Sequence, residues 1–150
     1  MVFSLILFAC QSGSEEIDET NVPDTPQIEI VVNSGDNMKF DVKTIVVREG
    51  QEVILTLNHL GKASIKTMGH NFVLLEQGVS IGKFAQKASK AIDNDYIPLD
   101  AEDEVIAYTK MLGGGESDVI VFQSPERGEY DFICSFPGHS SIMRGRLIVI

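Results

Sequence analysis

Residues 129–150, with the sequence EYDFICSFPGHSSIMRGRLIVI, decide the fold because they form a strand, a short loop and a second strand. The first strand leads into Cys134, and Tyr130, Phe132 and Cys134 share one face at a period of two residues. The second strand covers Arg146–Ile150. The Pro-Gly pair in the loop permits a sharp turn. We therefore expect the Cys, His and Met side chains of this loop to converge on the interior.

The rest of residues 27–150 repeats the pattern of short apolar strands separated by turn residues, which is typical of an all-β Greek-key sandwich or barrel. About eight strands are expected, and one helical segment is inserted among them over 80–92, where apolar residues recur every three or four positions. The expected strands are Ile28–Val32 with its continuation Met38–Phe40, Thr44–Val47, Val53–Leu57, Asn71–Leu75, Val105–Tyr108, Asp118–Phe122, Glu129–Ile133 and Arg146–Ile150.

Cys134, His139 and Met143 lie within ten residues of one another, and a further histidine, His70, lies upstream in the string MGHN. A thiolate, two imidazoles and a weakly bound thioether form the donor set of a blue-copper electron-transfer site. Sulfur suits Cu(I) and imidazole suits both oxidation states, so one site can hold either. The sequence therefore predicts a carrier of single electrons with one type 1 copper per chain.

Residues 27–150 resemble the azurins, bacterial blue-copper proteins with the cupredoxin fold. The matching stretches are MGHNFVL (68–74), DY (95–96), VIAYTK (105–110), CSFPGH (134–139) and MRG (143–145). The resemblance implies that His70, Cys134 and His139 are equatorial ligands, Met143 the axial ligand, and Gly69 a weak ligand through its carbonyl. It also implies that Asn71 ties the two ligand loops together and that Asn71 and the Phe136 N–H donate hydrogen bonds near the sulfur. Redox partners such as cytochromes or oxidoreductases would dock near His139, beside Met68, Phe136 and Pro137.

Three positions depart from the azurin pattern. The usual disulfide near one end of the barrel cannot form, because Gly50 stands in the region of one partner. Phe72 stands where azurins often carry Trp, and Tyr108 replaces a surface His. None of these residues is expected to touch the metal.

Other residues allow other interpretations. A third histidine, His59, suggests a zinc site with three imidazole ligands, but a partly buried, hydrogen-bonded histidine is the better interpretation. Met38 and Met111 are interpreted as packing residues.

The alternative function is a copper chaperone or storage protein, although chaperones offer exposed Met/His clusters or Cys pairs. Catalysis would need an open coordination position, so we expect no enzyme.

Residues 1–10 are apolar and end in Ala9-Cys10, which resembles a bacterial lipoprotein signal with a lipid-modified Cys10. An ordinary cleaved signal peptide is the alternative, and both export the protein to the periplasm or to a membrane. Residues 11–26 contain five acidic residues and no Lys or Arg, which predicts a flexible linker. With only two cysteines, a Cys10–Cys134 disulfide is possible in principle, but the lipid signal and the metal site account for both.

The chain of 150 residues is long enough for one domain, here 27–150, and its formal net charge is −10. Residues 27–150 carry 17 acidic and 12 basic side chains, with no run of Lys or Arg. This charge distribution excludes a nucleic-acid-binding surface.

Overall fold

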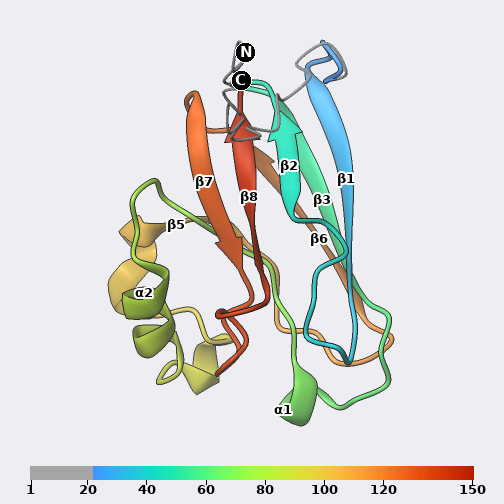
Figure 1. Ribbon diagram of the computed structural model, residues 1–150, viewed down its shortest axis with the longest axis vertical. Helices are drawn as coiled ribbons and strands as arrows, with labels where there is room; N and C mark the ends of the chain where they lie inside the picture. The colour runs from blue at the N-terminus through green and yellow to red at the C-terminus, as the bar shows by residue number, and fades with distance from the viewer. Residues whose placement is uncertain (1–21) are drawn as a thin grey trace, which may run out of the picture.

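A computed structural model describes residues 22–150, which form two β-sheets packed face to face (Figure 1). The predicted signal segment, Cys10 and most of the predicted linker lie outside the described residues. The strands are β1 (Gln27–Ser34), β2 (Thr44–Val47), β3 (Glu52–His59), β4 (Val73–Leu75), β5 (Val105–Tyr108), β6 (Ser117–Gln123), β7 (Gly128–Ile133) and β8 (Arg144–Val149). The prediction of an all-β sandwich with about eight strands is confirmed.

One sheet has the order β1-β3-β6 and the other β2-β8-β7-β4-β5. The connections β1–β2, β2–β3, β3–β4, β5–β6 and β6–β7 therefore pass from one sheet to the other, whereas β4–β5 and β7–β8 stay within one sheet. β1 runs parallel to β3, and β2 runs parallel to β8. The chain enters β1 and leaves β8 at the same end of the sandwich, while the β7–β8 connection lies at the opposite end (Figure 1).

The core follows from alternation along the strands. In β3, Val53, Leu55 and Leu57 point inward and are fully buried, and each contributes about 1.5–3 kcal/mol of hydrophobic stabilisation. Phe72 stacks on Phe132 with ring centroids 4.9 Å apart. Both rings belong to the same buried cluster as Cys134 and Met143, so the packed core directly supports the loop between β7 and β8.

The predicted helix is shorter than expected. Helix α2 covers Ile81–Ala88, and buried Phe84 and Ala88 anchor it on β4 and β7 residues. Its last turn tightens where the Ala91 N–H donates to the Ala88 carbonyl. Two 3-10 turns follow, Ile92–Asn94 and Leu99–Glu104, and a short helix α1 (Ile65–Met68) was not predicted.

The predicted strand Met38–Phe40 is wrong. A turn forms instead, in which the Met38 N–H donates to the Gly35 carbonyl and Met38 has a φ of 54°. Only Phe40 forms an isolated bridge, with Ser34. The Gly35-Asp-Asn37 string favours this turn over extended backbone.

The end of the predicted flexible linker differs from the prediction, because residues 22–26 are held against the domain by hydrogen bonds. The Gln51 side-chain amide donates to the carbonyls of Pro23 (2.9 Å) and Thr25 (2.7 Å). The Glu52 N–H donates to the Pro26 carbonyl, and Val22 is buried. Between residues 22 and 150 no helix has the length and hydropathy to cross a bilayer.

Candidate metal centre

Three donor atoms converge at the end of the sandwich where β7 stops. The Cys134 Sγ lies 3.6 Å from the Nδ1 of His139 and 3.9 Å from the Nδ1 of His70. All three side chains are buried, and their donor atoms lie within 4.8 Å of one another. This spacing leaves room for a single metal ion between them.

His70 reaches the site from the segment that follows α1. Its backbone exchanges two hydrogen bonds with Leu112, at 3.0 and 2.8 Å, which fixes the segment to the 109–116 loop. The His70 Nε2 lies 2.9 Å from the Gly35 carbonyl, so this nitrogen carries the proton and donates. Nδ1 consequently presents its lone pair toward Cys134. A hydrogen bond of this kind orients a ligating imidazole and fixes its tautomer.

The β7–β8 loop is built from successive turns that begin and end at the site. The Cys134 N–H donates to the Met143 carbonyl at 2.9 Å, which closes the loop at its base. The His139 carbonyl accepts from the Met143 N–H at 2.8 Å, and Gly138 has a φ of 84° that permits the turn. The Met143 side chain is fully buried in the cluster that contains Cys134.

Gly69 allows a close approach that a larger residue would block. Its carbonyl accepts a 3.8 Å contact from the Cys134 thiol. A Cβ at this position would lie 2.6 Å from the Ile65 carbonyl oxygen and 2.9 Å from the Met111 sulfur. Met111 is therefore a packing residue beside the site.

Asn71 joins the two segments that carry the donors. Its side-chain oxygen accepts from the Ser135 N–H at 2.8 Å. Its amide donates to the Ser135 hydroxyl at 2.8 Å and to the Asp95 carbonyl at 3.1 Å. The backbone N–H groups of Asn71 and Phe136 also bond to the Cys134 sulfur. Position 71 thus fixes the distance between His70 and Cys134.

Burial keeps the three donors uncharged in the metal-free protein. It raises the pKa of the Cys134 thiol to about 12, which the Asn71 and Phe136 N–H groups only partly oppose. Burial, together with nearby His70, lowers the pKa of His139 to about 4. The pKa of His70 is lowered mainly by burial. At neutral pH both imidazoles keep free lone pairs, and a metal cation replaces only the thiol proton. One sulfur and two nitrogens in a water-excluded site fit copper well.

His59 is outside the donor set. It is buried, its Nε2 donates to the Met68 carbonyl at 2.8 Å, and its Nδ1 accepts from the Gly61 N–H at 3.1 Å. Because both ring nitrogens are engaged, neither is free for a metal. The ring stacks on His70 with centroids 4.4 Å apart. The sequence predicted a hydrogen-bonded histidine but not this contact, which only the tertiary structure creates.

Apolar side chains surround His139, which is 4% exposed. The Phe136 ring packs against His139 at 4.6 Å and against Tyr96 at 5.3 Å. Pro137 and Ile142 of the same loop are exposed. Met68 is only half-buried.

Comparison with known proteins agrees with this geometry. The family described as copper binding proteins, plastocyanin/azurin family, matches residues 26–150. Azurin-1 of Alcaligenes xylosoxydans xylosoxydans is 36% identical over 123 residues, covering 79% of this chain and 95% of that protein. Outer membrane protein H.8 of Neisseria gonorrhoeae is 36% identical over 122 residues, covering 79% of this chain and 66% of that protein. The reduced auracyanin of Roseiflexus castenholzii superposes with a TM-score of 0.73 and 34% identity, covering 81% of this chain and 96% of the auracyanin.

Proposed function

This chain belongs to the plastocyanin/azurin family of copper-binding proteins, and from that premise we propose that it is a type 1 blue-copper electron-transfer protein. The observation that carries the proposal is the buried set of one thiol and two neutral imidazoles with donor atoms within 4.8 Å. Copper bound there would supply a one-electron Cu(I)/Cu(II) couple. The proposed ligands are His70, Cys134 and His139, with Met143 as a weak axial ligand and the Gly69 carbonyl as a weaker one.

The surrounding chain would keep the donors in place through a change of oxidation state. Asn71 bonds to the backbone and side chain of Ser135, and Gly35 orients the His70 ring. Burial excludes water from the sulfur. A site that is fixed in this way changes little between two oxidation states, which favours rapid electron transfer.

Electrons would enter and leave through His139. Its ring lies under the Phe136 ring and beside exposed Pro137 and Ile142, which form a small apolar surface. A small apolar surface suits brief encounters with redox proteins such as cytochromes or oxidoreductases, in which fast release matters more than affinity. Ile142→Lys would place a charge on this surface, so it should slow exchange with such a partner and leave the absorption spectrum unchanged.

A copper chaperone or storage protein is the alternative. A protein that delivers copper must expose its donors to an acceptor, whereas Cys134 is fully buried and His139 almost so. Catalysis is not proposed, because the four assigned side chains leave no position for a substrate. Ready loss of Cu(I) from the reduced protein to an acceptor protein would favour delivery over electron transfer.

We also propose that the protein is exported and anchored through a lipid on Cys10. Support comes from the apolar 1–10 segment and from the similarity to an outer membrane protein of Neisseria gonorrhoeae. Full-length protein should then partition into detergent, and Cys10→Ala should become soluble. A mature chain that begins after Cys10 would replace the anchor with a soluble periplasmic form.

The assignment of the ligands is tested by copper titration of metal-free protein. One copper per chain should produce the intense blue thiolate-to-copper absorption, and Cys134→Ser should abolish it because a hydroxyl cannot replace the thiolate. His59→Gln is the matched control, since it removes a buried imidazole that is not a proposed ligand. Blue colour in Cys134→Ser would refute the assignment.

A further inference from the structure

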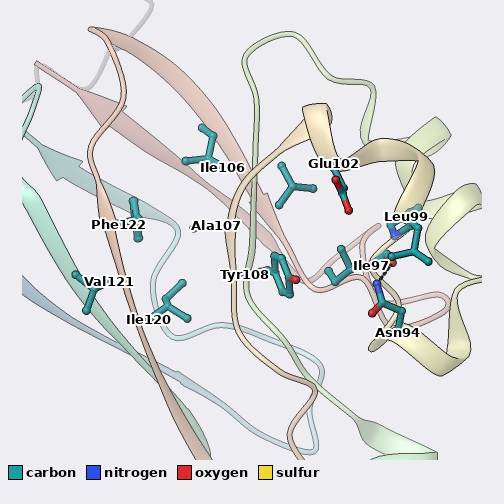
Figure 2. A pocket seen from close by; sticks show the side chains of 12 residues that line it. Asn94, Ile97, Leu99, Glu102, Ile106, Ala107, Tyr108, Ile120, Val121 and Phe122 are labelled. Atoms are coloured by element: carbon teal, nitrogen blue, oxygen red, sulfur yellow. Dashed lines mark hydrogen bonds between the residues drawn. The ribbon is translucent and has the colours of Figure 1, made fainter.

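An apolar groove opens between the two sheets, away from the donor set (Figure 2). It has a volume of about 450 Å³, within the range of small-molecule sites. Its walls come from three elements: the second 3-10 turn with Ile97 before it, strand β5, and strand β6. Figure 2 shows Ile106 and Phe122 on one side of the groove and Ile97 and Leu99 on the other.

The groove exists because the sandwich is open along this edge. β5 and β6 are the last strands of their sheets, and within the described chain each pairs with only one neighbour. Ile120 and Phe122 of β6 therefore stay partly exposed, whereas Leu55 on the adjacent β3 is fully buried. Leu99 is 73% exposed at the rim. Apolar surface is thus left uncovered over a connected concave region.

Negative charge predominates on the groove wall formed by residues 92–104, although Glu104 on this segment is paired with Lys87 of α2. Residues 92–104, which form one wall, contain six acidic residues and no Lys or Arg. Glu102 lines the groove, and none of its lining residues is basic. Tyr108, which is 47% exposed, brings a hydroxyl to the side that faces Glu102 (Figure 2). An apolar body would fill such a groove, and a positive charge at its rim would meet a carboxylate.

We propose that this groove binds a small amphipathic amine, meaning an aromatic or branched apolar body with one ammonium group. The apolar body packs on Ile106, Ile120 and Phe122, and the ammonium reaches the Glu102 carboxylate with Tyr108 beside it. No metal ligand lines the groove, so binding does not depend on the proposed electron-transfer function.

The test uses three probes with the same apolar body: phenethylamine, hydrocinnamate and phenethyl alcohol. Each is titrated into the Cu(I)-loaded protein and followed by amide chemical shifts. Shifts should be confined to residues 97–99, 105–108 and 120–122, with dissociation constants in the millimolar range for ligands this small. The amine should bind about two- to five-fold more tightly than the carboxylate, the size of one exposed ion pair.

Substitutions at exposed positions separate the contribution of the ion pair from that of apolar packing, and they leave the core unchanged. Glu102→Gln should weaken the amine and remove the preference over hydrocinnamate, while binding of the alcohol stays unchanged. Leu99→Ser should weaken all three probes. Glu49→Gln and Val31→Ser are matched controls at exposed positions outside the groove and should change nothing. The proposal is overturned if shifts centre elsewhere, if amine and carboxylate bind equally, or if the Glu49 control acts like Glu102→Gln.

Discussion

Replacing Asn71 by Ala should strongly destabilise the metal-free protein. The Asn71 side chain is fully buried, and its oxygen accepts a hydrogen bond from the backbone N–H of Ser135. Ser135 is itself only 2% exposed, so water could not replace the lost partner. An orphaned buried polar group costs about 1–3 kcal/mol, and the lost bonds to the Ser135 hydroxyl and the Asp95 carbonyl add about 0.5–1.5 kcal/mol each. The free energy of unfolding should therefore fall by about 2–6 kcal/mol.

Urea unfolding of the metal-free protein, followed by circular dichroism, measures this loss. The midpoint should drop by about 1–3 M at an unchanged slope, given a slope of roughly 2 kcal/mol per M. Asn37→Ala is the matched control, because Asn37 is exposed and should change the free energy by less than about 0.5 kcal/mol. Equal midpoints for Asn71→Ala and Asn37→Ala would refute the claim that Asn71 holds the two segments together.

Further predictions concern the axial ligand, the pH dependence and two glycines. Met143→Gln should lower the reduction potential in voltammetry, since a harder oxygen donor favours Cu(II), and Met143→Leu should raise it, both with copper retained. The metal-free protein should be most stable between about pH 6.5 and 9. Below this range stability falls, because the unfolded chain binds a proton on His139 that the folded form, in which this group has a pKa of about 4, does not bind. Above this range stability also falls, because the unfolded chain loses the Cys134 proton, which the folded form keeps since the pKa of its thiol is about 12. Unfolding measured across pH would contradict this if stability rose steadily in either direction. Gly145→Ala should lower the free energy of unfolding by about 1–3 kcal/mol, because its Cβ would lie 2.2 Å from the Phe132 ring. Gly82→Ala, in open space on α2, should raise it by up to about 1 kcal/mol, and urea unfolding measures both.

Local pattern was enough to predict most of the sandwich. Alternation in β3 placed Val53, Leu55 and Leu57 inward, and the periodicity of 80–92 placed Phe84 and Ala88 on the buried side of a helix. Alternation carries no information on which strands pair, so the parallel pairing of β1 with β3 was not predictable.

The donor set was predictable for a different reason: it depends on residue type and on spacing within one loop. Cys134 and His139 are five residues apart, and a tight loop leaves them few arrangements. His70 lies far upstream, and it was predicted as the second imidazole that a blue-copper donor set requires; the resemblance to a known family then supported it. The stacking of His59 on His70 and the contact of Met111 with Gly69 involve no local pattern, because tertiary packing alone brings these segments together.

The entry and exit of the chain at one end of the sandwich have a practical consequence for electrode attachment. β8 runs from the β7–β8 loop to the opposite end in six residues, which spans about 20 Å. A surface linker or a fused enzyme domain joined after Ile150 would therefore sit on the far side from His139. Immobilised films made in this way should present the apolar loop to solution in a common orientation. Random attachment through surface lysines such as Lys66 of α1 would instead leave part of the molecules with this loop against the electrode.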